Sequence, residues 1–214
     1  MNLTKVDKLI LQTQAHWHLD EGDDCYFYGE YTARRGFNFS ETNRLIFNFK
    51  KGMEKQSNAY EWRYKAKAIR QAAQMLRETL ASQPNLEALR GATLVPIPPS
   101  RSKKDPLYDG RVVSMLQQLS VGIGLDIREL VVQKETVEPS HSATSRATPN
   151  SLAQNYEIDV SLKDPYPNSL WVFDDVLTTG AHFKAMKKVL NEAYPGIPCI
   201  GVFLARRALE ADEI

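Results

Sequence analysis

The chain has 214 residues, a formal net charge of +1 at pH 7 and two cysteines. This length fits one domain with a sizeable core, and the near-neutral charge excludes a general electrostatic attraction to nucleic acid or membrane surfaces. The N-terminal residues are too polar for a signal peptide, and no apolar run is long enough to span a bilayer. We therefore expect a cytoplasmic protein without a disulfide framework or a membrane partner.

Residues 1–57 are predicted to form a small, aromatic N-terminal subdomain. Residues 3–15 have the apolar spacing of a short amphipathic helix, and residues 25–31, CYFYGEY, are typical of a strand. Residues 37–39 are expected to pair back as a hairpin. The segment 43–51, NRLIFNFKK, mixes aromatic and basic side chains that can contact nucleic acid. Without a net basic charge, packed aromatics and solvated lysines are the favoured interpretation, so a nucleic-acid partner is not expected.

Three potential zinc ligands lie close together near the N-terminus, namely His16, His18 and Cys25. Their spacing matches no standard zinc site, and no fourth ligand is evident. The favoured interpretation is that the histidines lie on the surface or have partners within the fold. The other cysteine, Cys199, lies in an apolar strand pattern and is expected to be a small buried side chain.

Residues 58–214 are predicted to form the core of the protein by alternating helices with short buried strands. The longest helix is expected over residues 60–80, which contain no Gly or Pro. Strands that alternate with helices indicate an α/β domain with a mostly parallel central sheet flanked by helices. The other elements expected from apolar spacing are strands near 92–97, 127–132, 155–160, 169–173 and 197–204 and helices over 107–119 and from residue 181 onward.

A basic loop follows the strand at 92–97. Its sequence over residues 99–105, PSRSKKD, places hydroxyl and cationic side chains between a strand and a helix, where they can hold an anion. Arg101 is the first candidate because its planar guanidinium matches phosphate oxygens. Ser100, Ser102 and Lys103 are the other candidates. The alternative is a solvated basic loop without a ligand.

Residues 134–150, KETVEPSHSATSRATPN, form the one long stretch that is poor in apolar residues. Its Ser, Thr and Pro content indicates a flexible loop. Long loops inside compact domains are commonly lids or binding loops. Lys134, His141 and Arg146 would then bring hydrogen-bond donors onto a phosphorylated substrate. The alternative is a connector with no role.

An acidic pair ends the strand predicted at 169–173. The apolar run LWVF is expected of a strand covered on both faces, and Asp174 and Asp175 follow it directly. Ligands of open α/β sheets bind at the carboxyl ends of the strands. Carboxylates at this place suit sugar hydroxyls or a hydrated Mg²⁺.

The residues after the acidic pair form a hydroxyl-rich turn. Thr178, Thr179 and Gly180 lead into a segment with helical spacing from Ala181 onward. A turn with free N–H groups at a helix N-terminus is a natural anion site. A sugar phosphate with adjacent hydroxyls satisfies both the turn and the carboxylates. The alternative is an ordinary strand-to-helix turn, for which Asp and Thr are also suitable.

The segment 170–182, LWVFDDVLTTGAH, resembles the PRPP-binding motif of type I phosphoribosyltransferases. Over most of its length the chain is similar to ComF-like phosphoribosyltransferases, through YGEY near Tyr28, RLIFNFKKG at 44–52, VPIPPSR at 95–101 and DDVLTTGA at 174–181. Two features depart from that family. The four-cysteine zinc module that usually begins such proteins is missing, and KKDPLYDGR replaces the usual segment rich in Arg and Asn.

The resemblance implies a type I phosphoribosyltransferase-like fold, with the N-terminal subdomain as a hood over the site. It also implies Mg²⁺-dependent displacement of pyrophosphate from PRPP by an acceptor. Thr178 stands where purine-salvage relatives often carry an acidic base, so a hypoxanthine or guanine acceptor is disfavoured, and the acceptor is unidentified. The implied catalytic residues are Asp174, Asp175 and Arg101, and the two aspartates also hold Mg²⁺, through water or ribose hydroxyls. The implied PRPP-binding residues are Val176, Leu177, Thr178, Thr179, Gly180, Ala181, Ser100, Ser102, Lys103, Lys134 and Arg146.

Other functions remain open at this point. The chain can be a regulatory protein that binds PRPP without transferring the sugar, and its aromatic N-terminal segment then contacts a protein partner. The ComF resemblance also brings in a role in DNA uptake, against which the low charge argues. A homodimer is a further open possibility. Finally, the chain can be an unrelated α/β protein that binds phosphate.

Overall fold

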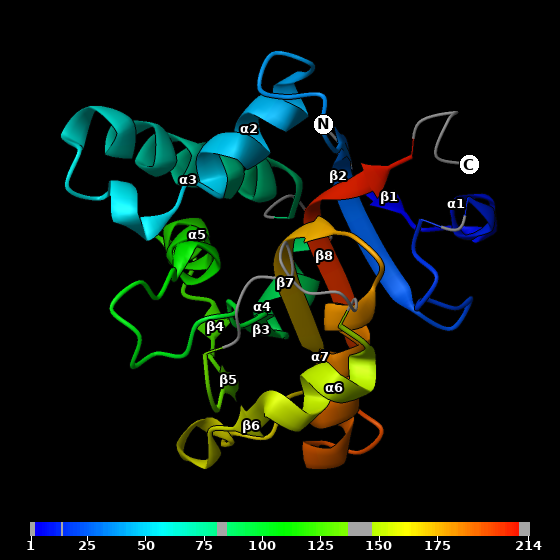
Figure 1. Cartoon of the computed structure of the whole chain (residues 1–214). Helices are drawn as coiled ribbons and strands as arrows, with labels where there is room; N and C mark the ends of the chain where they lie inside the picture. Colours follow the sequence, from blue (N-terminus) through cyan, green and yellow to red (C-terminus); the bar gives the residue numbers. More distant parts are fainter. Residues whose placement is uncertain (1–2, 14, 81–84, 137–146, 210–214) are drawn as a thin grey trace.

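A computed structural model describes residues 3–13, 15–80, 85–136 and 147–209 of the chain. At its centre is a six-stranded sheet in the order β1-β2-β8-β7-β3-β4. All neighbouring strands are parallel except β1, which is antiparallel to β2. Helices cover both faces of the sheet (Figure 1), so the predicted α/β class with a mostly parallel, helix-flanked sheet is confirmed. The strands are β1 (Thr4–Lys5), β2 (Asp24–Thr32), β3 (Thr93–Pro96), β4 (Asp126–Ile127), β7 (Leu170–Leu177) and β8 (Cys199–Ala208).

Two hydrophobic clusters hold the helices against the sheet. The first packs under helices α2 (Glu41–Phe49), α3 (Ala59–Leu80) and α5 (Arg111–Ser120). The second packs under α7 (Ala181–Ala193) on the opposite face. Successive residues of β7 point to opposite faces of the sheet, and accordingly Val172 belongs to the second cluster and Phe173 to the first. The remaining elements are α1 (Lys8–Gln12), α4 (Asn85–Arg90), α6 (Pro149–Asn155) and the 3-10 turns Met53–Lys55 and Val160–Leu162.

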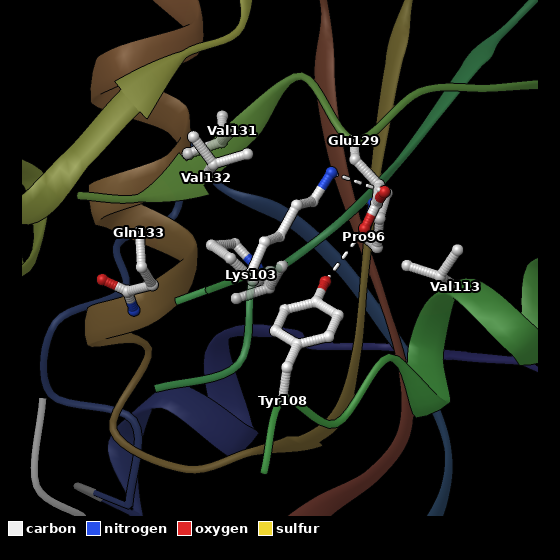
Figure 2. Close-up of a pocket in the computed structure, with 10 residues that line it drawn as sticks. Pro96, Lys103, Tyr108, Val113, Glu129, Val131, Val132 and Gln133 are labelled. Atoms are coloured by element: carbon white, nitrogen blue, oxygen red, sulfur yellow. Dashed lines mark hydrogen bonds and ion pairs between the residues drawn. The ribbon is translucent and has the colours of Figure 1, made fainter. Parts of the chain in front are cut away.

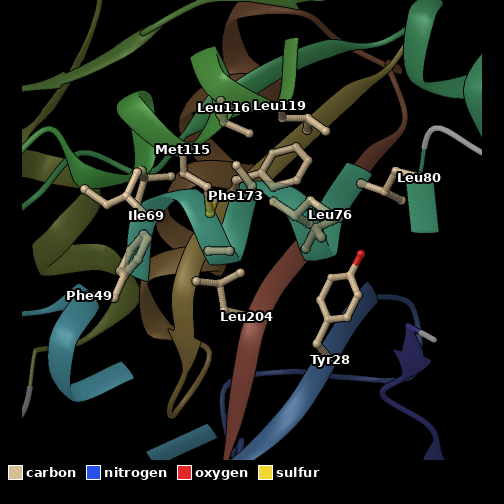
Figure 3. Packing of buried hydrophobic residues seen from close by; sticks show 14 of the residues in the cluster. Tyr28, Phe49, Ile69, Leu76, Leu80, Met115, Leu116, Leu119, Phe173 and Leu204 are labelled. Carbon is tan, nitrogen blue, oxygen red and sulfur yellow. The ribbon is translucent and has the colours of Figure 1, made fainter. Parts of the chain in front are cut away.

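Helix α3 confirms the prediction of a long helix over residues 60–80. Its first turn is capped by Asn58, whose side-chain oxygen accepts hydrogen bonds from the N–H groups of Tyr60 and Glu61 at 3.1 and 3.2 Å. Its apolar stripe packs against α5 and the sheet, with Leu76 fully buried among aromatic and aliphatic side chains (Figure 3). No helix in the described ranges combines the length and apolarity needed to cross a bilayer.

The N-terminal segment contributes to the central sheet. Strand β2 pairs in parallel with β8 over most of its length, so this segment adds a strand to the sheet. The hood over the site stays a prediction. The helix expected over 3–15 is shorter, because β1 occupies its start and α1 covers Lys8–Gln12 only. The boundary near residue 57 stays a prediction.

The hairpin expected at residues 37–39 is wrong. These residues lie in a turn segment that leads into α2, whose N-cap is Ser40. Asn43, which is buried, closes this turn with hydrogen bonds to the backbone N–H and C=O of Thr32 and to the carbonyl of Gly36. A buried side-chain amide thus replaces the expected strand pairing.

The strand expected at 127–132 is divided in two. β4 ends at Ile127 and belongs to the central sheet, whereas β5 (Val131–Gln133) pairs antiparallel with β6 (Tyr156–Ile158) in a separate two-stranded sheet. β6 confirms the short strand expected at 155–160. The loop expected over 134–150 ends earlier than predicted, since Thr148 caps α6, which begins at Pro149. Residues 137–146 of this loop lie outside the described residues.

Replacement of Leu76 by alanine tests the first hydrophobic cluster. Leu76 has no exposed surface, so Leu76→Ala should lower the free energy of unfolding by about 2–5 kcal/mol, through lost burial and a cavity. The matched control is Leu9→Ala in α1, because the Leu9 side chain is 73% exposed and its loss should cost less than about 0.5 kcal/mol. Urea denaturation of the wild type and both variants measures the difference. Equal costs would contradict the packing.

Candidate functional site

The candidate site lies between the carboxyl ends of β3 and β7. From β7 the chain passes through α7 to β8, and from β3 it passes through α5 to β4 on the other side. The connections of these two neighbouring strands therefore run toward opposite edges of the sheet, and their helices α5 and α7 pack on opposite faces. Such a switch point in an open α/β sheet leaves a crevice in which ligands bind. The acidic pair with the turn after it and the basic loop both follow the paired part of these two strands, at this switch point.

Strand β7 extends further than predicted and carries the acidic pair within it. The last contact with β3 is at Phe173, whose carbonyl accepts a hydrogen bond from the Ile97 N–H at 2.9 Å. Beyond that point β7 continues to Leu177 and pairs with β8 alone. The expectation that the strand ends at residue 173 is therefore wrong. Because side chains alternate along a strand, Asp174 and Asp175 point to opposite faces of the sheet.

Asp175 is held by two cations on the face of α2 and α5. Lys50, the C-cap of α2, lies 3.2 Å from Oδ1, and Arg111, the first residue of α5, donates to Oδ2 from Nε at 3.0 Å and Nη2 at 2.7 Å. The Asp175 side chain is 3% exposed. Burial alone would raise its pKa, but the charges of Lys50 and Arg111 and their hydrogen bonds hold the pKa well below the usual range.

Asp109 and Lys65 form a second pair of charges next to Arg111. Asp109 accepts a hydrogen bond from Arg111 Nη1 at 2.7 Å and another from Lys65 Nζ at 2.6 Å. Lys65 lies in the middle of α3, is 2% exposed and also donates to the Lys51 carbonyl at 2.6 Å. The network therefore ties α2, α3 and the start of α5 to the end of β7. A buried charge network of this kind is stable only when every member is paired.

Asp174 is in a different state from its neighbour. Its Oδ1 accepts a hydrogen bond from the Asp175 N–H at 2.7 Å, and Oδ2 accepts none from a described residue. Burial and then the charge of Asp175 raise the pKa of Asp174 to about 7. One carboxyl group of the pair is thus paired and ionised, and the other is half-buried and free to bind.

The donor set fits Mg²⁺ at Asp174 rather than at Asp175. Both Asp175 oxygens are already occupied by Lys50 and Arg111, and cations at these distances disfavour a further divalent ion. Asp174 keeps one oxygen free, which suits a hydrated ion that retains most of its waters. No group of three or more His, Cys, Asp or Glu side chains within the described ranges is arranged to hold a metal, so the protein alone offers no closed metal site there.

In the 178–181 turn, the backbone N–H groups of residues 178–180 have no acceptor among the described residues. Gly180 has φ +85°, which disfavours other residues, and a Cβ at this position would lie 2.7 Å from the Leu19 side chain. Both the backbone conformation and the lack of space therefore require glycine here. The Ala181 N–H reaches the Thr179 hydroxyl at 3.3 Å. Together with the first turn of α7, these groups form a concentration of donors without protein acceptors.

The N-terminal segment supports this turn from the other side. The carbonyl of Thr178 accepts a hydrogen bond from His16 Nδ1, and the carbonyl of Thr179 accepts one from the His18 N–H at 3.0 Å. His16 is buried, and burial lowers its pKa, so its ring is neutral with the proton on Nδ1. With both carbonyls turned to the N-terminal segment, the N–H groups of the turn are free to face a ligand.

His16, His18 and Cys25 do not form a zinc site. His16 contacts the turn through Nδ1, whereas His18 Nε2 accepts a hydrogen bond from the Trp17 indole at 3.1 Å. Cys25 is fully buried, and burial raises the pKa of its thiol above the usual range. Cys199 is half-buried, and burial raises its pKa to about 12. No group of three or more His, Cys, Asp or Glu side chains in the described part of the chain includes these residues in a metal-binding arrangement.

The basic loop is present at the crevice, but its cations contact carboxylates of the protein. Arg101 Nη1 lies 2.9 Å from Asp105, and Lys103 Nζ lies 2.7 Å from Glu129. Figure 2 shows Lys103 and Tyr108 both reaching Glu129 beside Pro96. The Ser102 N–H donates to the Thr136 hydroxyl at 3.1 Å, which links the loop to the segment after β5. Ser100 forms no hydrogen bond or ion pair with a described residue.

Of the three candidates from the long loop, Lys134 lies within the described residues. Lys134 donates to the carbonyl of Gln154 at 2.8 Å, at the end of α6, and so serves the β5–α6 contact. Arg146 and His141 lie outside the described residues. Of the predicted site residues, the structure therefore places Asp174, Asp175 and the 178–181 turn together, with Arg101 and Lys103 nearby in internal ion pairs. Val176 and Leu177 are buried strand residues.

Sequence reasoning missed the partners of the acidic pair. The burial of Lys65 could have been predicted from the helical spacing, because Lys65 stands three and four residues before Ala68 and Ile69 on the buried stripe of α3. Arg111 lies in the segment that departs from the family pattern. Lys50 was interpreted as solvated. Tyr156 and His182, whose Oη and Nδ1 atoms are 2.9 Å apart, were also missed.

Replacement of Arg111 tests the charge network. Arg111→Met leaves Asp175 and Asp109 buried without their main cation, so the free energy of unfolding should fall by about 3–5 kcal/mol at pH 7. The part of this loss due to Asp175 should become smaller between pH 7 and pH 3. Without Arg111 the buried carboxyl takes up a proton at a higher pH than in the wild type, where Lys50 and Arg111 hold its pKa well below the usual range, and a protonated Asp175 no longer needs the cation. The control is Lys5→Met, since Lys5 and Asp24 form an exposed pair, whose loss should lower the stability much less than the loss of Arg111. Urea denaturation at pH 7 and pH 3 measures both. A loss no larger than that of the control would contradict the network.

Comparison with models of protein families and with curated proteins finds no match for the chain.

Proposed function

We propose that this chain is a phosphoribosyltransferase-like protein that binds PRPP with Mg²⁺ and transfers the phosphoribosyl group to an acceptor, with release of pyrophosphate. The observation that carries the proposal is the juxtaposition of two features at the switch point of the sheet. A glycine turn with unpaired N–H groups lies at the start of α7, and a carboxyl group with a free oxygen lies just before it on β7. These two features match a terminal phosphate and the hydroxyl groups of a sugar.

The 178–181 turn would anchor the 5′-phosphate. Its N–H groups and the α7 dipole favour an anion, and the hydroxyls of Thr178 and Thr179 add donors. Thr178 is exposed, so its hydroxyl is accessible to a ligand. Because His16 and the His18 N–H fix the carbonyls of the turn, its donors are oriented before a ligand arrives. Such preorganisation reduces the ordering cost of binding.

Asp174 and Asp175 would have separate roles. Asp174 accepts hydrogen bonds from the ribose hydroxyls and, through them or through water, holds Mg²⁺. When bound, Mg²⁺ supplies charge neutralisation for the leaving pyrophosphate. Asp175 is withdrawn from direct contact by Lys50 and Arg111, and it holds the start of α5 and the end of α2 in place. The negative charge of the pair also favours positive charge that develops on the ribose in the transition state.

The pyrophosphate would be bound by the basic loop after an exchange of partners. Arg101 is paired with Asp105, and Lys103 with Glu129, both in partly exposed pairs. Such pairs are worth little in free energy, so a pyrophosphate group can replace Asp105 and Glu129 at small cost. Ser100 and Ser102 would add donors from the same loop. Lys134 and Arg146 are secondary candidates in this proposal, because Lys134 contacts α6.

A regulatory protein that binds PRPP without transfer is the second candidate. It is favoured by exposed aromatic side chains on and beside α2, at Phe37, Phe39 and Phe47, which are 36%, 48% and 56% exposed. The guanidinium groups of Arg44 and Arg35 lie over the rings of Phe37 and Phe39 at 5.5 and 5.2 Å. Exposed aromatic and arginine side chains in one patch are typical of protein interfaces.

Calorimetric titration with PRPP and Mg²⁺ tests the site. The wild type should bind PRPP saturably, and Asp174→Asn should weaken binding by about tenfold or more, because it removes a charged acceptor of hydrogen bonds. Asp24→Asn is the matched control, since Asp24 begins β2 at the other end of the sheet and is half-exposed. Release of pyrophosphate in the presence of acceptor bases and amines separates the enzyme from the regulatory protein. No binding by the wild type would refute both candidates.

The pH dependence of binding tests the state of Asp174. Its pKa of about 7 means that the carboxyl is largely protonated at pH 6 and ionised at pH 8. Affinity for PRPP with Mg²⁺ should therefore rise between these values, as Asp174 becomes the acceptor that the sugar and the ion require. Phosphate groups of the ligand also ionise near pH 6, so Asp174→Asn serves as the reference and should show a smaller rise. Identical pH profiles for the two proteins would contradict the role of Asp174.

A further inference from the structure

A second pair of polar side chains lies beside the acidic pair and the turn. Tyr156 follows α6 and begins β6, whereas His182 lies in the first turn of α7, directly after the 178–181 turn. The Tyr156 hydroxyl and His182 Nδ1 are 2.9 Å apart. The charge of Asp174 acts on Tyr156, and the charges of Lys50 and Asp175 act on His182. Because His182 is the second residue of α7, the pair lies at the end of α7 that follows the 178–181 turn.

Hydrogen-bond accounting determines which atom donates in this pair. Tyr156 is 3% exposed, and no described residue other than His182 contacts its hydroxyl. If Nδ1–H donated to the tyrosine oxygen, the tyrosine O–H would be buried without an acceptor, which is costly. The arrangement that leaves no buried O–H unpaired has the Tyr156 O–H donating to Nδ1. A neutral imidazole that accepts at Nδ1 carries its proton on Nε2.

Both side chains are in the protonation states that this arrangement needs. Burial, and then the charge of Asp174, raise the pKa of Tyr156, so its hydroxyl stays protonated. Burial, and then the charge of Lys50, lower the pKa of His182, so its ring is neutral at pH 7. The half-buried His182 therefore presents an Nε2–H group that donates to no described residue.

We propose that His182 is a further ligand-binding residue, which donates a hydrogen bond from Nε2–H to the sugar-phosphate part of the ligand held by the 178–181 turn. Tyr156 is its positioning residue, because the hydrogen bond to Nδ1 fixes both the ring and the tautomer. This inference rests on the proposed function and adds a donor from a side chain to the N–H groups of the turn. It assigns a role in ligand binding to the segment where α6 ends and β6 begins.

The tautomer can be measured without any ligand. In protein with ¹⁵N-labelled histidine, long-range ¹H–¹⁵N spectra at pH 8 distinguish a proton on Nε2 from one on Nδ1. The signals of His182 are assigned by their loss in His182→Gln. We expect the Nε2–H form in the wild type and a mixture of both forms in Tyr156→Phe, in which the donor to Nδ1 is missing. A wild-type ring with its proton on Nδ1 would overturn the proposal.

Calorimetry with ribose 5-phosphate and Mg²⁺ as the probe tests the contact. His182→Ala should weaken binding by about tenfold, as expected for a lost hydrogen bond to a charged group. His182→Gln should recover part of the loss, because its amide N–H reaches the position of Nε2–H. Tyr156→Phe should weaken binding less than His182→Ala. Tyr166→Phe is the control for the tyrosine change, since Tyr166 is 57% exposed and packs on Tyr194, and it should bind as the wild type does.

Binding of magnesium pyrophosphate, measured on the same variants, locates the contact. It should be unchanged in His182→Ala, since the proposed donor serves the sugar-phosphate part alone. If the wild type binds ribose 5-phosphate and Asp174→Asn weakens it, but His182→Ala binds as tightly as the wild type, the role of His182 is refuted and the proposed function stands. If the wild type binds neither ribose 5-phosphate nor PRPP, both are refuted.

Discussion

The buried carboxylate of Asp175 is the constraint on which the arrangement of the site depends. A charge at 3% exposure near the end of a strand requires compensation. Compensation comes from two elements far apart in sequence, Lys50 at the end of α2 and Arg111 at the start of α5. Asp109 and Lys65 then balance Arg111. These ion pairs connect α2, α3 and α5, which lie on one face of the sheet, to the end of β7.

The pairing of Asp175 also makes the two neighbouring aspartates differ in charge state and in hydrogen-bond partners. Because Asp175 takes the cations on one face, Asp174 on the other face has no cation from the described residues in hydrogen-bond contact. Burial beside a like charge raises its pKa to about 7. Two carboxyl groups pushed apart in pKa by their surroundings are typical of functional sites. The turn, Asp174, Tyr156 and His182 then lie together on the face of α6 and α7, where the proposed ligand contacts are concentrated.

Local sequence patterns predict the α/β class and the strand, turn and helix that form the centre of the candidate site. The apolar run before Asp174, the glycine turn and the helical spacing after Ala181 are all short-range signals, and the structure has them as β7, the turn and α7. The uninterrupted helix of residues 60–80 was equally clear. By contrast, the division of 127–132 between two sheets depends on tertiary pairing that no local pattern records.

The missed residues share one physical cause. Lys50, Arg111 and His182 act through partners that lie far away in sequence, at separations of 125, 64 and 26 residues. A single sequence carries no sign of such pairing, apart from the charge of Lys65 on an apolar stripe. In the basic loop the local pattern was clear, but the ion pairs of its cations were not predicted. Its composition indicated an anion site, but the pairing of Arg101 with Asp105 and of Lys103 with Glu129 depends on the fold around it.

We propose that the phosphate and the hydroxyls of a phosphorylated sugar bind together where β7 meets α7. A crystal structure of the protein grown with ribose 5-phosphate and Mg²⁺ tests this directly. We expect the phosphate on the N–H groups of the 178–181 turn and the ribose hydroxyls within hydrogen-bond distance of Asp174, with Asp175 still bound to Arg111. A phosphate bound elsewhere, or a crevice that stays empty at saturating ligand, would contradict it.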